Sequence, residues 1–181
     1  MPYLVAAVGF VGALCLLDLL LTFGVIRRLR AVSVSQSQDH GLDVSVSTLE
    51  PGQSAEPFTA RTTTPGTTVS GPAGLRLIAF FSTHCSICPK RAPSFVSYVR
   101  ANGLRAQDVL AIVTSVDGDL SGATYLDDVA AVARVSTEEP EGPVATAFQV
   151  TGFPAFCLLE PDGTVRQTTY DPADLPVLAV A

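Results

Sequence analysis

Several residue types are scarce in this sequence. Among 181 residues there is no tryptophan, and there are only two histidines and four cysteines. Charged residues make up 15% of the chain and are acidic on balance, with a formal net charge of −6. Nucleic acids select for clustered Lys and Arg, so this composition argues against nucleic-acid binding.

The shortage of histidine and cysteine also limits metal binding. Cys85 and Cys88 have the Cys-x-x-Cys spacing that half of a zinc site would show. A structural zinc site needs a second ligand pair at similar spacing. Cys15, Cys157 and the two histidines provide none. We therefore expect thiol redox chemistry, with no metal and no cofactor.

Polar residues are almost missing from residues 3–26, which are apolar for long enough to cross a bilayer as a helix. Basic residues follow at 27, 28 and 30, and neither a basic start nor an Ala-x-Ala-like cleavage site is present. We expect residues 1–30 to be a permanent transmembrane anchor with a basic stop. Asp18 lies within the run and is interpreted either as a contact with a membrane partner, such as an electron donor, or as a tolerated protonated carboxyl.

Two further segments follow the anchor. Residues 31–48 are polar and lack large apolar side chains, which is typical of a flexible linker. Residues 49–181 have the length and the apolar content of one folded domain.

The two cysteines stand where a strand is followed by a helix. Residues 75–79 are an apolar run typical of a buried strand, and Cys88, Ala92, Phe95 and Val99 fall on one face of a predicted helix. Free backbone N–H groups and the helix dipole stabilise a thiolate at such a position. We expect Cys85 to be the nucleophile and Cys88 the resolving thiol.

These motifs resemble the thioredoxin fold, and within it the membrane-anchored disulfide reductases of the TlpA/ResA and MauD type. The resemblance rests on the Cys85–Cys88 pair, on Pro93 within the following helix, and on residues 150–156, which are similar to a loop with a cis-proline. It covers roughly residues 49–170. It implies an α/β fold with a central mixed sheet flanked by helices, an N-terminal hairpin and an insertion.

The resemblance also implies roles for other residues. Pro154 would be cis and would bring the Phe153 carbonyl to the cysteines, where a substrate chain could pair as an added strand. His84 replaces the usual aromatic residue and would modulate the thiolate when charged, or point to solvent. Cys157 is interpreted as a core residue rather than a third redox thiol.

Two departures from the family affect the mechanism. Ala79 occupies the position of the buried Asp of thioredoxins, and Arg91 that of the Glu of ResA-like reductases. The acid that would shuttle a proton to the resolving thiol is thus missing from both places. Water, or a carboxylate of the insertion such as Asp117 or Asp119, could replace it.

The remaining pattern predicts the order of elements along the domain. A hairpin is expected around Pro65-Gly66, and a closing helix is not expected after residue 171 because of two prolines. The other expected elements are a strand at 109–113, a helix at 123–128, a helix at 144–148 and a second hairpin from strands 155–159 and 165–170. Residues 129–135 fit either a continuation of the helix or an extra strand, and the family resemblance favours a strand at 131–135.

We expect a membrane-tethered thiol-disulfide oxidoreductase that acts in cell redox homeostasis on protein dithiols and disulfides. A peroxiredoxin-like peroxidase and a non-enzymatic membrane adaptor are the alternatives. The basic residues after the anchor place the domain in the cytoplasm, whereas the family resemblance places it outside. We expect the extracytoplasmic side of the cell membrane.

Overall fold

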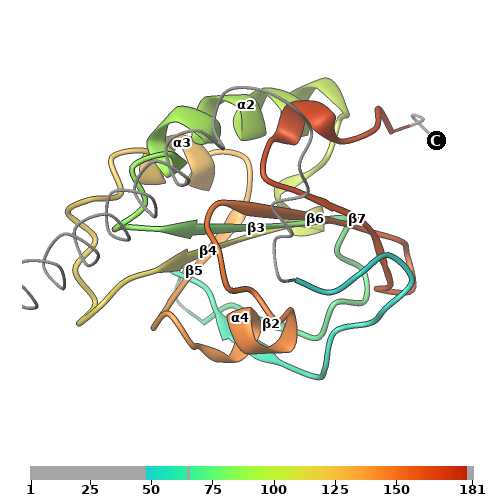
Figure 1. The fold of residues 1–181 in the computed structure, drawn as a ribbon, viewed down its shortest axis with the longest axis horizontal. Helices are drawn as coiled ribbons and strands as arrows, with labels where there is room; N and C mark the ends of the chain where they lie inside the picture. Colours follow the sequence, from blue (N-terminus) through green and yellow to red (C-terminus); the bar gives the residue numbers. More distant parts are fainter. Residues whose placement is uncertain (1–47, 65, 179–181) are drawn as a thin grey trace, which may run out of the picture. The chain divides into compact units, whose positions relative to one another are not determined.

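A five-stranded mixed sheet forms the centre of the described domain, in the strand order β5-β4-β3-β6-β7 (Figure 1). The computed structural model describes residues 48–64 and 66–178. Strands β3 and β4 and strands β4 and β5 are parallel, whereas β6 is antiparallel to both β3 and β7. The strand bounds are β3 Leu77–Ser82, β4 Val109–Thr114, β5 Arg134–Glu138, β6 Ala155–Leu159 and β7 Val165–Thr169.

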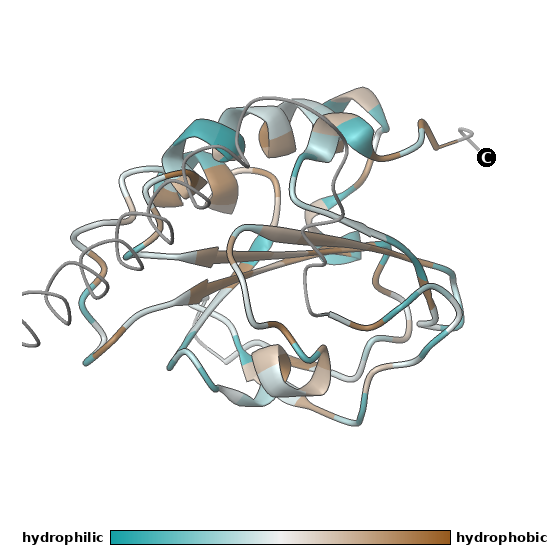
Figure 2. Cartoon of the chain, in the orientation of Figure 1, coloured by the Kyte–Doolittle hydropathy of each residue, from teal (hydrophilic) through white to brown (hydrophobic). Residues whose placement is uncertain are grey.

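Side chains of the central strand β3 alternate between two apolar layers, as the pleat of a strand requires. Leu77, Ala79 and Phe81 face one cluster, and Ile78 and Phe80 face the other. All five side chains are fully buried. Figure 2 shows the strands as the most hydrophobic part of the chain, between two covering layers. The strand predicted at 75–79 forms as β3, which begins two residues later and runs on to Ser82. The buried strand predicted at 109–113 is confirmed as β4.

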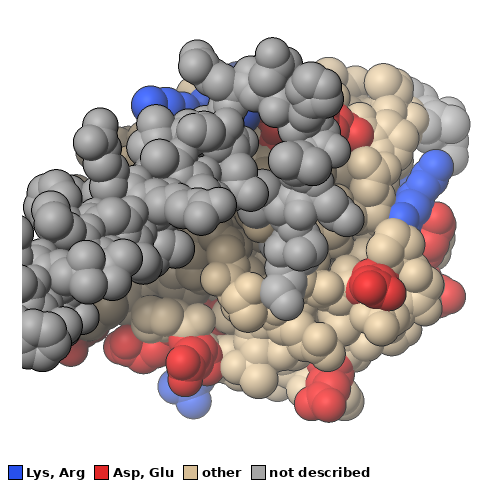
Figure 3. Space-filling model, in the orientation of Figure 1, with Lys and Arg blue, Asp and Glu red and all other residues tan. Residues whose placement is uncertain are grey.

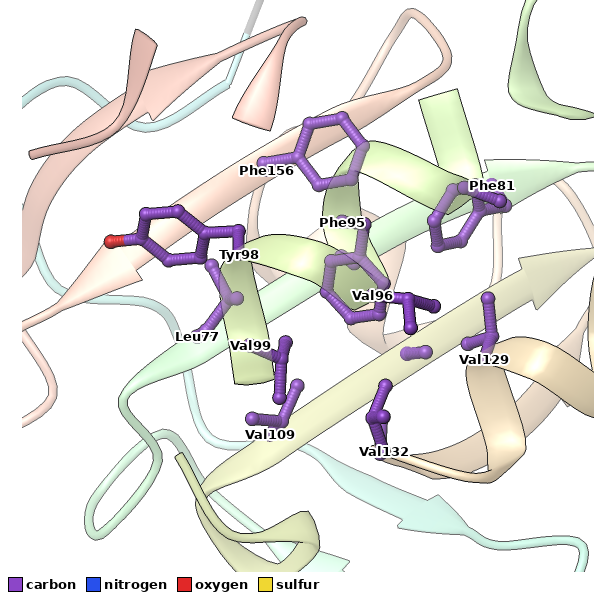
Figure 4. Close-up of a cluster of buried hydrophobic side chains, with 14 of the residues drawn as sticks. Leu77, Phe81, Phe95, Val96, Tyr98, Val99, Val109, Val129, Val132 and Phe156 are labelled. Carbon is purple, nitrogen blue, oxygen red and sulfur yellow. The ribbon is translucent and has the colours of Figure 1, made fainter. Parts of the chain in front are cut away.

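The first layer is covered by helices α2, Cys88–Ala101, and α3, Leu126–Ala130, and by the short 3-10 helix η2, Pro172–Asp174 (Figure 1). Phe95 of α2 lies between two aromatic side chains of the sheet, with ring centroids 5.7 Å from Phe81 and 5.9 Å from Phe156 (Figure 4). The predicted helix face of Cys88, Ala92, Phe95 and Val99 is buried in this layer. Pro93 lies inside the helix, as expected.

The second layer holds an N-terminal hairpin and a short helix (Figure 1). Strands β1, Thr59–Arg61, and β2, Thr68–Ser70, pair antiparallel, which confirms the predicted hairpin. Helix α4, Pro143–Ala147, packs against the same cluster through Val144. A further 3-10 helix, η1 at Ala106–Asp108, precedes β4.

The insertion between β4 and β6 differs from the prediction in its boundaries. The helix predicted at 123–128 is formed by Leu126–Ala130, and the strand predicted at 131–135 is β5, which begins at Arg134. The Ala133 N–H still donates to the Val129 carbonyl at 3.0 Å, so the chain is held in the last helical turn. Pairing with β4 can therefore begin only at Arg134, opposite Leu110.

The C-terminal segment also agrees with the prediction. The hairpin of β6 and β7 forms, and only the short 3-10 helix η2 follows it in the described residues. Pro172 and Pro176 prevent this segment from forming a regular α-helix.

The predicted anchor, residues 1–30, and the predicted linker, apart from Thr48, lie outside the described residues. Among residues 48–64 and 66–178, no helix has the length and apolar character needed to cross a membrane. Figure 3 shows acidic side chains scattered over the visible part of one face, with few basic ones beside them.

Candidate active site

The cysteines lie at the turn between β3 and α2. The backbone N–H of Cys88, the first residue of the helix, donates to the Cys85 sulfur at 3.1 Å. Ile87, at the N-cap, provides no side-chain cap, so this N–H is one of the donors that helices leave unpaired at their start. A sulfur in this place receives both a hydrogen bond and the positive end of the helix dipole.

A second chain segment reaches the same sulfur. The Cys85 thiol donates to the Phe153 carbonyl at 3.4 Å, and the Phe153–Pro154 peptide bond is cis, as the family resemblance implied. Strand β6 begins directly afterwards and pairs with β3, which fixes this loop beside the cysteines. The structure thus brings Cys85, Phe153 and Pro154 together.

Cys88 differs from Cys85 in burial. It is fully buried, whereas Cys85 is partly exposed. Burial raises the pKa of Cys88 well above its ordinary value, and hydrogen bonding with Cys85 raises it further. Cys88 therefore stays a protonated thiol near neutral pH, which suits a resolving residue rather than the first nucleophile.

Cys85 opens onto a shallow groove of about 440 Å³. Its two walls are the active-site turn and the loop before Pro154, and Ile87, 49% exposed, stands at its edge. The groove is lined by Ser82, His84, Cys85, Ser86, Ile87, Thr151, Gly152 and Phe153. The lining combines polar side chains with the apolar side chains of Ile87 and Phe153.

His84 is exposed at the groove and faces the insertion. Its Nδ1 lies 3.1 Å from the Thr83 hydroxyl. Hydrogen bonds from Ser121 lower the pKa of Asp119, and the nearby His84 lowers it further.

The two positions without the family acid have different surroundings. Ala79 is fully buried in the α2 layer. Arg91 forms an ion pair with Asp171, so its charge is compensated by the segment after β7. In the described part of the chain, no carboxylate is among the groups that shift the pKa of Cys88.

Cys157 lies apart from the other two described thiols. It belongs to β6 but faces the hairpin layer, and the Thr168 hydroxyl lies 3.6 Å from its sulfur. Burial raises the pKa of Cys157 to about 12. The structure thus places it in the core, as the sequence suggested.

Sequence reasoning missed Tyr125, which follows the insertion loop and is 4% exposed. Its hydroxyl donates to the Ser82 carbonyl at 3.3 Å, and its ring lies 5.1 Å from that of Phe81. A single aromatic residue in an insertion carries no motif, so only the folded chain reveals the contact.

Among residues 48–64 and 66–178, no three His, Cys, Asp or Glu side chains converge as metal ligands would. The sequence matches no protein-family model, and no curated protein matches it significantly.

Solved structures do share the fold. The thioredoxin domain of a thiol-disulfide oxidoreductase from Bacteroides vulgatus aligns with a TM-score of 0.52 and 20% identity, over 66% of this chain and 88% of that one. A thiol:disulfide interchange protein from a Bacteroides species aligns with a TM-score of 0.51 and 20% identity, over 69% and 86%. A thiol-disulfide oxidoreductase from Bacteroides fragilis gives a TM-score of 0.50 and 15% identity, over 64% and 89%. The fold is thioredoxin-like.

Proposed function

We propose that this protein is a membrane-tethered thiol-disulfide oxidoreductase. The observation that carries the proposal is the unequal pair of cysteines. The accessible Cys85 sulfur accepts the Cys88 N–H, while Cys88 itself is buried with a raised pKa. One thiol is thus placed to attack and the other to wait for an intramolecular step.

The reaction follows from this arrangement. The Cys85 thiolate attacks one sulfur of a substrate disulfide, forms a mixed disulfide and releases the other substrate sulfur, which takes up a proton. The Cys88 thiol then loses its proton and attacks Cys85, which forms the Cys85–Cys88 bond and releases the second substrate thiol. The substrate gains two electrons, and the enzyme dithiol loses them. The reverse sequence oxidises a substrate dithiol.

The groove supports protein substrates. Phe153 and Pro154 stand beside Cys85, and the loop that carries them forms one wall of the groove. An extended segment on either side of a substrate cysteine could pair with this backbone, while its side chains meet Ile87. His84, which lines the groove on the side of the active-site turn, would modulate the exchange.

Tethering and side belong to the proposal as well. The apolar run at residues 3–26 supports a single-pass anchor in the cell membrane, with the bilayer as one partner and a membrane electron donor as another. The domain would face the extracytoplasmic side, where disulfides are made and repaired.

A reduction assay tests the chemistry. Full-length protein in detergent should catalyse reduction of insulin by dithiothreitol, measured as turbidity, and Cys85→Ser should abolish it. Cys157→Ala is the matched control, because it removes a described thiol that does not reach the groove. Equal activity of Cys85→Ser and the intact protein would refute the proposal and favour an adaptor, and hydrogen peroxide consumption would favour a peroxidase.

A further inference from the structure

The insertion rests directly on the active-site turn. Gly122 approaches the Thr83 backbone so closely that a Cβ at position 122 would lie 2.5 Å from the Thr83 carbonyl oxygen. Real Cβ atoms do not tolerate such a distance, so this position requires glycine. The close approach holds the start of the insertion against the residue two positions before Cys85.

Tyr125 makes a second contact between the insertion and the turn. Its hydroxyl donates to the Ser82 carbonyl at 3.3 Å, while its buried ring packs on Phe81. Burial raises the pKa of Tyr125, and the nearby Cys88 and Cys85 raise it further. The phenol therefore keeps its proton and remains a donor at physiological pH.

Ser82 is the junction between this phenol and the cysteines. Its carbonyl also accepts the Cys85 backbone N–H at 3.2 Å, and its hydroxyl accepts the His84 N–H at 3.3 Å. Hydrogen bonding from the Ser82 backbone also acts on the Cys88 sulfur, whose pKa it lowers. The position of Ser82 therefore affects both the backbone at Cys85 and the pKa of Cys88.

We propose that Tyr125 is a positioning residue that, through the Ser82 carbonyl, holds the turn bearing Cys85 in its reactive geometry. The inference rests on the proposed thiol chemistry and adds a residue to it. Without the hydroxyl, Ser82 would have one donor fewer, and the turn could loosen around the Cys88 N–H that stabilises the Cys85 sulfur.

The test compares two tyrosines of the same layer. Tyr125→Phe removes the hydroxyl and keeps the ring. Tyr98→Phe is the matched control, because Tyr98 belongs to the same apolar cluster (Figure 4). Its hydroxyl also donates to a backbone carbonyl, that of Pro176 on the C-terminal segment, at 2.7 Å. The rate constant for alkylation of Cys85 by iodoacetamide at pH 7 is measured in each reduced full-length protein, with the adduct located by mass spectrometry.

We expect Tyr125→Phe to lower the rate about two- to tenfold, as the loss of one hydrogen bond in the network allows. Tyr98→Phe should leave the rate unchanged, although both variants should unfold at a lower temperature. Gly122→Ala should also lower the alkylation rate of Cys85, because its added Cβ would push the insertion away from Thr83. An unchanged rate in Tyr125→Phe, or an equal loss in Tyr98→Phe, would overturn the inference.

Alkylation needs only a thiol, so this test is separate from that of the proposed function. If only Tyr125→Phe slows the alkylation of Cys85, but the intact protein cannot reduce insulin, the oxidoreductase proposal is refuted and the role of Tyr125 stands. Normal insulin reduction, together with equal Cys85 alkylation rates in Tyr125→Phe and Tyr98→Phe, would refute the role of Tyr125 and leave the oxidoreductase proposal standing.

Discussion

Arg91, in the first turn of the helix that carries Cys88, forms an ion pair with Asp171 after strand β7. The side chains are 40% and 23% exposed, so solvent screens the pair only in part. The position where the reductases that the sequence resembles carry an acid thus holds a base whose charge is compensated. The pair joins the active-site helix to the C-terminal segment.

This ion pair should make a small contribution to stability. In a double-mutant cycle with Arg91→Ala and Asp171→Asn, we expect a coupling free energy of about 0.2–1 kcal/mol. Asp171 also caps η2 by accepting the Ala173 N–H at 3.1 Å, so Asp171→Asn alone should affect η2 as well. Urea unfolding of the four proteins measures the coupling free energy, and a value indistinguishable from zero would show that the ion pair does not stabilise the fold.

The two cysteines should react in a fixed order. Cys85 should be alkylated first near neutral pH, because Cys88 is buried and its pKa is raised. Cys88→Ser should accumulate mixed disulfides with protein substrates, visible on non-reducing gels, since the intermediate can no longer be resolved. Faster modification of Cys88 than of Cys85 in the folded protein would reverse the assigned roles.

The redox potential should be less negative than that of thioredoxin, which is about −270 mV. The Cys88 N–H bond to the Cys85 sulfur and the positive charge of Lys90 stabilise the reduced form, and no acid stands at Ala79 to oppose it. Arg91 contributes less than its charge suggests because Asp171 compensates it. Equilibration with glutathione and differential alkylation measure the potential, and a value at or below thioredoxin's would show that burial outweighs these groups.

Cys157 should control part of the alkaline stability. Its pKa rises from an ordinary 9.0 to about 12 in the folded protein, so the unfolded chain loses this proton first as pH rises. The contribution to stability is present below pH 9.0 and falls by about 1.4 kcal/mol per pH unit up to about 12. Cys157→Ala should remove this component, giving a shallower loss of melting temperature over that interval than the unchanged protein. Parallel curves would show that the thiol does not titrate as a buried group.

The membrane anchor is tested by fractionation. Full-length protein should pellet with membranes and resist carbonate extraction, because residues 3–26 are long and apolar enough to span a bilayer. A chain starting near Thr48 should remain in the supernatant. Recovery of the full-length chain in the soluble fraction would refute the membrane tether. A reporter fused to the C-terminus would show on which side of the membrane the domain lies.

Local patterns predicted the parts of the fold that depend on short stretches of chain. The period of Cys88, Ala92, Phe95 and Val99 indicated a helix with one buried face, and that face packs on the sheet. The cis bond before Pro154 was predicted only through resemblance, because most bonds before proline are trans. Boundaries in the insertion were less predictable, since the start of β5 is set by pairing with β4.

The unpredicted parts of the site are contacts between distant residues. Tyr125 contacts the Ser82 carbonyl, which lies 43 positions earlier in the sequence, and no local pattern predicts such a contact. Asp171 reaches Arg91 across an even longer stretch. Asp119 was predicted as a possible replacement acid, but it is not among the groups that shift the pKa of Cys88.

Strand β3 lies between β4 and β6 and has no free edge, so the dithiol stands at the end of the best-protected strand of the sheet. Sheets open from their edges, which here are β5 and β7. Amide protons of β3 should therefore exchange with solvent only when the whole domain unfolds. Because β3 stays closed and Cys88 belongs to α2, the motions that expose Cys88 and that admit and release a partner must come from the chain around the groove.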